Sequence, residues 1–405
     1  MLSKPEVHEW ISDVSGPHWY WYAKVLTGND TLLTGAHQAG PYIPKQVVFT
    51  LFPSVANSRD LNPRRSVDVS IDSHGVSTTC SAIWYNNRVV GVGTRNEARI
   101  TGWGGSSSPI LDPDSTGSLC VFAFMRFGES DATACRVWLA RSLEEEEALS
   151  SRVGGVDPGI SVFLDPREAD LDFFGRDLDQ PCRMPREQIP PEWLEQFPSP
   201  SAIHDLSVAN LPSARQKNPD DRLLVRRSCE FELFRSIEEA AVLPRIVRGF
   251  QSVDHFIDYA NAVTNRRKAR SGASLELQLR RIFDEEDVRY SHGAVSEHGK
   301  RPDFLFPSVD AYQAAKFPAG KLRMLGVKTT VKDRWRQVID EAERLPIKHL
   351  LTLQEGVSVS QFKQMTVAGI RLVVPARLQS AYSPEVRSEL ISLTDFIVQL
   401  SHLNT

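Results

Sequence analysis

The spacing of apolar and turn-forming residues changes near the middle of the chain, and this change constrains the possible fold more than any other feature. Residues 1–175 carry short apolar runs such as QVVFTLF, VDVSI and SLCVFAFM, separated by Gly, Ser, Pro, Asn and Asp. Turn residues at this spacing are typical of a β-barrel or β-sandwich. Further on, apolar residues recur at helical spacing, and MLGVKTT, HLLTLQ and IRLVVP read as buried strands between helices. The sequence therefore predicts a mainly β domain followed by an α/β domain.

A segment dense in proline and charge lies between the two halves. Residues 176–201 read RDLDQPCRMPREQIPPEWLEQFPSPS. Because proline stiffens a chain and charged side chains keep it solvated, this segment favours a linker. We therefore expect an N-terminal domain over residues 1–175, a linker over 176–201 and a C-terminal domain over 202–405.

Composition limits the class of protein. The hydrophobic content of 41% and the charged content of 24% are typical of a soluble globular protein. No apolar run approaches the roughly 18 residues that a membrane span needs. The first residues, MLSKPEVHEW, lack the apolar core of a signal peptide. We expect a cytoplasmic protein with no membrane partner.

The five cysteines do not form a recognisable pattern. Their number is odd, and they show neither CxxC nor Cys/His ligand spacing, which argues against a disulfide framework and against structural zinc. We expect them to behave as small buried hydrophobic residues. They are Cys80, Cys120, Cys135, Cys182 and Cys229.

Positive charge is local rather than general. The formal net charge is -4, so any nucleic-acid site must come from clusters of basic residues. Two clusters lie in the C-terminal half, in TNRRKARSG and in GVKTTVKDRWR, and a weaker one lies in RNEARITGWGG. Each cluster alone is better explained by a solvated basic surface.

A carboxylate and a lysine are expected to meet at neighbouring strand ends. Asp303 directly precedes the apolar run FLF, and Lys328 directly follows the strand MLGV. Such a pair suits phosphodiester cleavage, because the acid can hold Mg²⁺ while the lysine orients the attacking water and offsets phosphate charge. In the PD-(D/E)xK nuclease pattern a second acid lies two residues before the lysine, but that position is Gly326.

Two other acids can replace the missing carboxylate. The segment DRWRQVIDEAERL carries apolar residues at helical spacing, and Glu341 lies off that stripe, thirteen residues after Lys328. Glu276 lies on the polar side of an earlier predicted helix. The candidate set is therefore Glu276, Asp303, Lys328 and Glu341.

Longer motifs resemble a known family. NRRKARSGASLELQL, KRPDFLFPS and LRMLGVKTTVKDRWRQVIDEAERL in the C-terminal half, with GNDTLLTGAHQAGPYIP, IWYNNR and TRNEARITGWG in the N-terminal half, resemble the EcoRII-type (type IIE) restriction endonucleases of the PD-(D/E)xK nuclease superfamily. The resemblance covers nearly the whole chain. Motifs of this length are far more specific than an isolated Pro-Asp pair and a lysine.

The resemblance implies a fold and an activity. It implies a B3-like β pseudobarrel followed by a restriction-endonuclease-like α/β domain. The family members are homodimers that use Mg²⁺ to cut double-stranded DNA at a short CCWGG-type site. A second copy of the site binds the N-terminal domain as an allosteric effector and relieves autoinhibition.

The resemblance also assigns residues in the catalytic domain. It gives Asp303, Lys328 and Glu341 catalytic positions, the first and last holding the metal, with Glu276 as a supporting acid and Tyr312 as a nearby active-site residue. The reading segment includes Lys332, Asp333 and Arg334, in the same basic stretch as Arg336. Independently of the family, lysine and arginine donate to guanine and a carboxylate accepts from cytosine. Without the resemblance, surface ion pairs at the start of a helix explain these residues slightly better.

In the N-terminal domain, the resemblance assigns effector contacts on two arms. The loop GVGTRNEAR departs from the family, because glycine, valine and alanine stand where the relative carries lysines and the loop is one residue longer. This departure leaves the affinity for the effector open. The implied contacts are Lys24, His37, Tyr42, Arg88, Arg95, Glu97 and Arg99.

Two other functions fit the same residues. β-Barrel domains of this kind also occur in DNA-binding regulators, which need neither metal nor cleavage. A nuclease of the same fold can instead serve repair or recombination and act on DNA structure. A small-molecule enzyme is disfavoured, because the sequence has neither a glycine-rich phosphate loop nor a nucleophile elbow.

Overall fold

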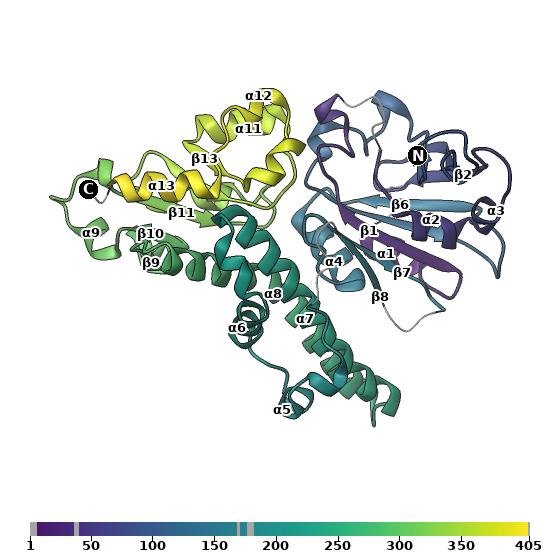
Figure 1. The fold of residues 1–405 in the computed structure, drawn as a ribbon, viewed down its shortest axis with the longest axis horizontal. Coiled ribbons are helices and arrows are strands. Elements are labelled where there is room, and N and C mark those ends of the chain that lie inside the picture. The colour runs from purple at the N-terminus through teal and green to yellow at the C-terminus, as the bar shows by residue number, and fades with distance from the viewer. Residues whose placement is uncertain (1–5, 36–39, 168–170, 176–181, 404–405) are drawn as a thin grey trace. The chain divides into compact units, whose positions relative to one another are not determined.

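The computed structural model describes residues 6–35, 40–167, 171–175 and 182–403. Contacts within the chain divide it into two compact units. The first unit consists of Met1–Gly175, Glu355–Gln361 and Ala381–Pro384, and the second contains the remaining residues. Figure 1 labels the elements of both units, which are described separately below.

One curled, eight-stranded sheet forms the frame of the first unit, in the order β4-β3-β2-β6-β5-β1-β7-β8 (Figure 1). Neighbouring strands are antiparallel except β2 and β6, which run parallel. The prediction of a mainly β N-terminal domain is confirmed. The strands are β1 (Trp19–Val25), β2 (Arg64–Ile71), β3 (Val76–Tyr85), β4 (Glu97–Thr101), β5 (Leu119–Met125), β6 (Ala134–Leu139), β7 (Ile160–Leu164) and β8 (Leu171–Gly175).

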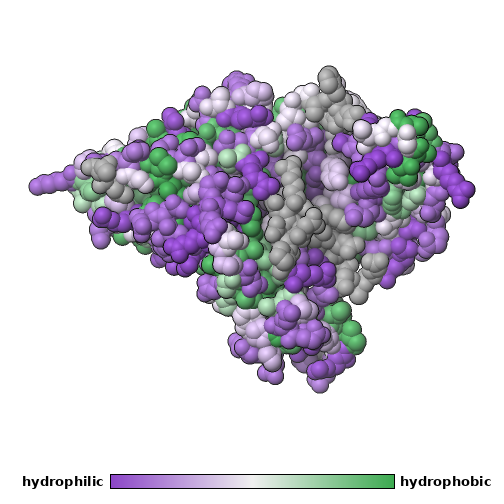
Figure 2. Space-filling model, in the orientation of Figure 1, coloured by the Kyte–Doolittle hydropathy of each residue, from purple (hydrophilic) through white to green (hydrophobic). Residues whose placement is uncertain are grey.

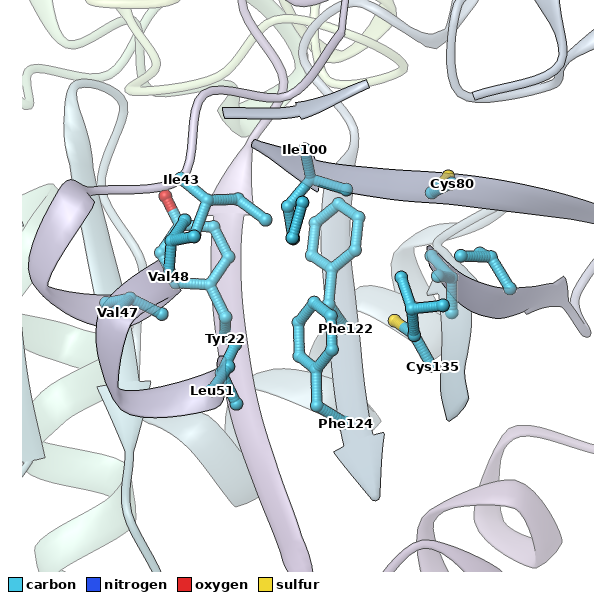
Figure 3. Packing of buried hydrophobic residues seen from close by; sticks show 14 of the residues in the cluster. Tyr22, Ile43, Val47, Val48, Leu51, Cys80, Ile100, Phe122, Phe124 and Cys135 are labelled. Atoms are coloured by element: carbon cyan, nitrogen blue, oxygen red, sulfur yellow. The ribbon is translucent and has the colours of Figure 1, made fainter. Parts of the chain in front are cut away.

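Both faces of the central strands are buried, which explains their nearly continuous apolar sequences. Successive side chains of a strand point to opposite faces. Tyr22 and Phe122 therefore enter one core with residues of α2 (Lys45–Leu51), as Figure 3 shows. Val55 of α3 (Pro53–Ala56) belongs to the same core. Trp21 and Val121 enter a second core, which also contains residues of α1 (Val7–Asp13) and α4 (Leu143–Val153).

A mixed five-stranded sheet forms the frame of the second unit, in the order β13-β12-β11-β10-β9. β11, β12 and β13 are parallel, whereas β10 is antiparallel to both β11 and β9. The three runs predicted as buried strands correspond to β11, β12 and β13. The strands are β9 (Ser291–His292), β10 (Phe304–Phe306), β11 (Arg323–Val327), β12 (Lys348–Leu351) and β13 (Ile370–Val373).

Helices complete the second unit. The C-terminal half of α8 packs against the sheet, because Leu275, Leu279 and Ile282 lie on one face of the helix and are fully buried. This face was predicted from the helical spacing of SLELQLRRIF. The helices are α5 (Pro191–Glu195), α6 (Pro200–Asn210), α7 (Pro219–Arg248), α8 (Val253–Glu285), α9 (Val309–Gln313), α10 (Arg336–Ile339), α11 (Val359–Val367), α12 (Pro384–Arg387) and α13 (Leu393–Leu403).

The segment expected to be a linker is structured where the model describes it. Residues 182–201 contain a 3₁₀ turn, α5 and the start of α6. Cys182 and Ile189 are buried in a cluster with residues of α6 and α7, because they supply the apolar surface that these helices cover. Residues 176–181 lie outside the described residues.

One cysteine expectation is wrong. Cys182 and Cys229 form a disulfide across 47 residues of sequence. The pair meets through the packing of residues 182–189 on α7, which spacing along the chain does not reveal. Cys80, Cys120 and Cys135 are free and buried, as predicted.

A second correction concerns the helix expected after Lys328. Apolar residues at helical spacing run to Leu345, but α10 ends at Ile339. The chain cannot continue as a helix, because Ala342 has a positive φ of 51°. Ala342 and Leu345 are nevertheless buried, so the apolar pattern marked burial correctly but not the length of the helix.

The surface is consistent with the composition. Figure 2 shows a mainly hydrophilic face with scattered apolar patches. No helix among the described residues is both long and apolar enough to cross a membrane.

Candidate active site

Antiparallel pairing of β10 and β11 brings Asp303 and Lys328 together. Asp303 directly precedes β10 and Lys328 directly follows β11, and the register pairs Phe304 with Leu325. The Lys328 Nζ atom lies 3.6 Å from Asp303 Oδ2. The backbone N–H of Val327 donates to the same carboxylate oxygen over 2.6 Å. The sheet therefore fixes both groups at one strand end.

Gly326 explains how a carboxylate from the following segment comes close. A Cβ atom at Gly326 would lie 3.1 Å from two side-chain atoms of Val338 in α10. The absence of a side chain thus lets α10 lie directly on β11, and a side chain at this position would have to displace Val338. Glu341 follows Val338 by three residues, and its N–H donates to the Val338 carbonyl over 3.2 Å.

Glu341 interacts electrostatically with both Asp303 and Lys328. Burial raises the pKa of its carboxyl to about 7, and the negative charge of Asp303 contributes, while Lys328 acts in the opposite direction. One of its oxygens, Oε2, is buried and has no hydrogen-bond partner among the described residues. A buried acceptor without a donor is costly, so this oxygen is suited to a ligand.

The two carboxylates fit a hard divalent cation. Asp303 and Glu341 offer oxygen ligands, their mutual repulsion favours a positive charge between them, and Glu341 Oε2 is unpartnered. Among the described residues, no group of three or more His, Cys, Asp or Glu side chains could hold a metal. A two-carboxylate site matches the behaviour of Mg²⁺, which retains several waters.

Glu276 lies beside the site rather than in this pair of acids. Its Oε2 atom lies 2.9 Å from His292 Nε2. His292 is paired with Phe304 across β9 and β10, and its ring contacts the Phe304 ring at 5.1 Å between centroids. His292 was not predicted as a site residue, because its short strand gives no clear pattern.

Tyr312 is buried and its hydroxyl is bound to another acid. The hydroxyl donates to both carboxylate oxygens of Glu297 over 2.6 Å, and it accepts from the backbone N–H of Arg344 over 3.2 Å. Burial opposes ionisation of Glu297, but the Tyr312 hydrogen bond and the amides of residues 343–344 together lower its pKa. Neither Glu297 nor Arg344 was predicted.

The predicted reading segment lies between β11 and α10. The side chain of Gln354 accepts from the backbone N–H groups of Val331 and Lys332 over 2.8 and 3.3 Å. This anchors the start of the segment. Asp333 and Arg336 are exposed and form an ion pair of 3.0 Å, while Arg334 is half-buried.

On the first arm of the first unit, Asp30 is hydrogen-bonded to two of the predicted effector contacts, Lys24 and Tyr42. Lys24 is only 8% exposed, and its ammonium donates to Asp30 Oδ1 over 2.8 Å. The same Asp30 oxygen accepts from the backbone N–H of Tyr42 over 2.9 Å, and the Tyr42 side chain is 53% exposed. His37 lies outside the described residues.

On the second arm, an acid lies between two arginines. Glu97 of β4 accepts from Arg95 Nη2 over 2.6 Å and from Arg99 Nη2 over 3.1 Å. Burial raises the pKa of Glu97, but the hydrogen bonds from the two arginines outweigh it and the pKa is lowered. The Arg95 guanidinium also lies over the Tyr85 ring, 3.9 Å from its centroid, and Arg88 is exposed on the adjoining loop.

Comparisons with known proteins point to one family over both units. A family model described as EcoRII C terminal matches residues 234–397, and one described as restriction endonuclease EcoRII, N-terminal, matches residues 15–168. The chain is 41% identical over 399 residues to the type II restriction enzyme EcoRII of Escherichia coli. This alignment covers 98% of the chain and 97% of the relative.

Solved structures with partial similarity are also restriction endonucleases. Metal-depleted Ecl18kI in complex with uncleaved, modified DNA is 20% identical, with a TM-score of 0.45, and covers 52% of this chain and 80% of that chain. A PspGI–substrate DNA complex is 16% identical, with a TM-score of 0.43, and covers 52% of this chain and 94% of that chain. Because both domain models match and the full-length identity is high, the chain belongs to the EcoRII family of type II restriction endonucleases, which are site-specific deoxyribonucleases.

Proposed function

We propose that this enzyme is a Mg²⁺-dependent homodimer that cuts both strands of DNA at a short CCWGG-type site. A second copy of the site binds the N-terminal domain as an effector and relieves autoinhibition. The catalytic part is supported by the Lys328–Asp303 contact at one sheet edge, by the electrostatic influence of both groups on Glu341, and by a buried Glu341 oxygen that has no donor among the described residues. A restriction enzyme with these properties acts in the cytoplasm.

Each group has a distinct chemical role in the proposed hydrolysis. Asp303 is held by the Val327 amide, so its second oxygen is available for Mg²⁺. Glu341 supplies the other carboxylate ligand. When bound, the cation supplies positive charge that stabilises the phosphate in the transition state. Lys328 orients the attacking water and offsets the charge of the phosphate from its position beside Asp303.

Lys332, Asp333, Arg334 and Arg336 are proposed to read the CC and GG edges. The anchoring of this segment by Gln354, next to the strand that carries Lys328, supports a coupling between recognition and cutting. Lysine and arginine would donate to guanine, and Asp333 would accept from a cytosine amino group.

The effector site is proposed on the two arms of the first unit. Glu97 already holds Arg95 and Arg99 in fixed directions, which reduces the entropy lost when they contact DNA. Lys24 is mostly buried, so we propose that it acts through Asp30, which holds the exposed Tyr42. His37 and Arg88 complete the proposed set.

The proposed homodimer needs a surface that a second copy can cover. Such a surface occurs where α7 ends and α8 begins, at residues 246–257, where five large apolar side chains are 46% to 79% exposed. Contiguous apolar patches of this kind mark interaction sites. Arg248, Asp254 and Asp258 of this hairpin are exposed, so they offer self-complementary charge to a two-fold partner. The five apolar residues are Ile246, Val247, Val253, Phe256 and Ile257.

Incubation with a sequenced plasmid tests the proposal. With Mg²⁺ we expect discrete fragments whose ends map to CCWGG-type sites, and with a chelator we expect binding without cleavage. A shifted but uncut plasmid at every Mg²⁺ concentration would instead indicate a DNA-binding regulator. Cleavage only at free or structured ends would indicate a nuclease of repair or recombination.

A further inference from the structure

The segment that carries Glu341 has no regular secondary structure to hold it. α10 ends at Ile339, and the buried Ala342 adopts a left-handed conformation with φ 51°. This conformation is unfavourable for a residue with a Cβ atom. It persists only where the surroundings impose it. Contacts outside the segment must therefore hold residues 341–344.

The carboxylate of Glu297 supplies one such contact. Glu297 follows β9, and it meets Tyr312 of α9, whose hydroxyl donates to both of its oxygens over 2.6 Å. The Tyr312 oxygen accepts in turn from the backbone N–H of Arg344 over 3.2 Å. The amides of Glu343 and Arg344 also stabilise the ionised Glu297.

The side chain of Arg344 supplies a second contact with the same region. Its guanidinium donates to the carbonyl oxygens of Tyr312 and Phe317, and to that of Ala314 over 3.0 Å. A guanidinium suits this position, because its several N–H donors can reach carbonyl oxygens at and just beyond the end of α9. Arg344, at the end of the segment that carries Glu341, is therefore held at both its backbone and its side chain.

We propose that Glu297, Tyr312 and Arg344 form a clamp that directs the Glu341 carboxylate toward Asp303 and Lys328. The clamp rests on the proposed nuclease function. Glu297 and Arg344 are positioning residues in this scheme, and Tyr312 also acts by position rather than by contact with DNA. The polar atoms of the clamp are bound to one another, and Glu341 Oε2 has no hydrogen-bond partner among the described residues.

Two conservative variants of the full chain test the clamp. Glu297→Gln keeps the shape of the side chain and removes its charge, and Tyr312→Phe removes only the hydroxyl. We expect each to slow single-turnover cleavage about 10- to 100-fold, because small displacements of a catalytic group have effects of this size. We also expect a higher half-saturating Mg²⁺ concentration and unchanged metal-free DNA binding. Wild-type rates and Mg²⁺ dependence in both variants would overturn the proposal.

Tyr290→Phe is the matched control. Its hydroxyl also donates to a carboxylate, that of Asp284, over 2.9 Å, and its ring packs on Phe304. This variant loses the same chemical group from the same unit but leaves the clamp intact, so it should cut like the wild type. An equal loss of cleavage in Tyr290→Phe and Tyr312→Phe would show general loosening and reject the clamp.

The double variant separates positioning from direct action. If Tyr312 acts through Glu297, the double variant Glu297→Gln/Tyr312→Phe should cut no more slowly than the slower of the two single variants, because the two residues then act as one unit. If instead the rate losses of the two single variants multiply in the double variant, Tyr312 acts independently of Glu297, which contradicts the clamp.

Hydrogen exchange makes the test independent of cleavage. The amides of residues 341–344 should exchange faster in Glu297→Gln than in the wild type, and unchanged exchange would overturn the clamp even in an enzyme that does not cut. Conversely, a wild type that neither cuts nor binds Mg²⁺ refutes the proposed function, while the exchange experiment still decides the clamp.

Discussion

Glu341 and Asp303 interact electrostatically, but they differ in how firmly their carboxylates are held. Asp303 is held by the Val327 amide and the Lys328 ammonium, whereas Glu341 has a buried oxygen with no partner among the described residues. Burial, together with the charge of Asp303, raises the pKa of Glu341 to about 7. The raised pKa of Glu341 has measurable consequences near neutral pH.

Metal-free stability should depend on pH through Glu341. Its pKa is higher in the folded chain than the ordinary carboxyl value, so the folded state binds the proton more tightly. The resulting stabilisation is present below the ordinary carboxyl pKa and is lost as pH rises through about 7. We expect the melting temperature of the wild type, relative to Glu341→Gln, to fall over this range. Parallel curves would contradict the raised pKa. Added Mg²⁺ should remove the difference by favouring the ionised form.

Lys328→Ala should abolish cleavage and spare specific binding. The substitution removes the cation beside Asp303, but it leaves Gln354 and the reading segment unchanged. Single-turnover assays and metal-free gel shifts measure the two properties separately. The exposed lysine in Lys321→Ala is a control that should behave like the wild type. Cutting by Lys328→Ala at the wild-type rate would refute the assigned role.

The positions of Asp303 and Lys328 could be predicted from the sequence because each directly adjoins a strand with an uninterrupted apolar run. Local pattern was sufficient there. Glu341 was proposed for the site, but its helix was predicted too long, because the apolar spacing continues through the left-handed turn at Ala342. Glu297 could not be predicted, since its importance depends on a contact with a tyrosine 15 residues away in another element.

The N-terminal contacts show a similar limit. Alternation along β1 places Lys24 on the same face as Tyr22, which enters the core, so the parity of the strand indicated an inward lysine. The family match favoured a DNA contact instead. Asp30 resolves the conflict, because it neutralises the buried ammonium and also binds the backbone of Tyr42.

Asp333→Ala should relax recognition of G·C pairs. Loss of an acceptor for cytosine is expected to reduce discrimination by about 1–3 kcal/mol. The variant also breaks an exposed ion pair with Arg336, so Glu385→Ala, which breaks an exposed ion pair with Lys363 of 3.1 Å, is the matched control. Binding to the site and to single-base variants of it gives the comparison. Equal selectivity in the two variants would show that Asp333 forms only a surface ion pair and does not contact the bases.

A fragment beginning at residue 176 should cut without an effector if the N-terminal domain is autoinhibitory. The boundary matters, because Cys182 and Ile189 belong to the core of the second unit. A fragment beginning at 190 loses both residues and should be less stable, which makes it a control for folding. Cleavage of a plasmid with a single site measures the requirement for an effector. A folded 176–405 fragment that cuts no better than the full chain on this plasmid would count against autoinhibition.

Val253→Asp should weaken the proposed dimer. Val253 is 72% exposed at the hairpin formed by α7 and α8, and an added carboxylate there would disrupt an apolar contact with the partner. Sedimentation at several protein concentrations should show a larger dissociation constant than for the wild type. Val367→Asp is the control, because Val367 is 91% exposed on α11 and lies outside the hairpin. If the wild type dimerises and both variants dimerise equally well, the interface lies elsewhere. If the wild type is monomeric at every concentration, the homodimer itself is refuted.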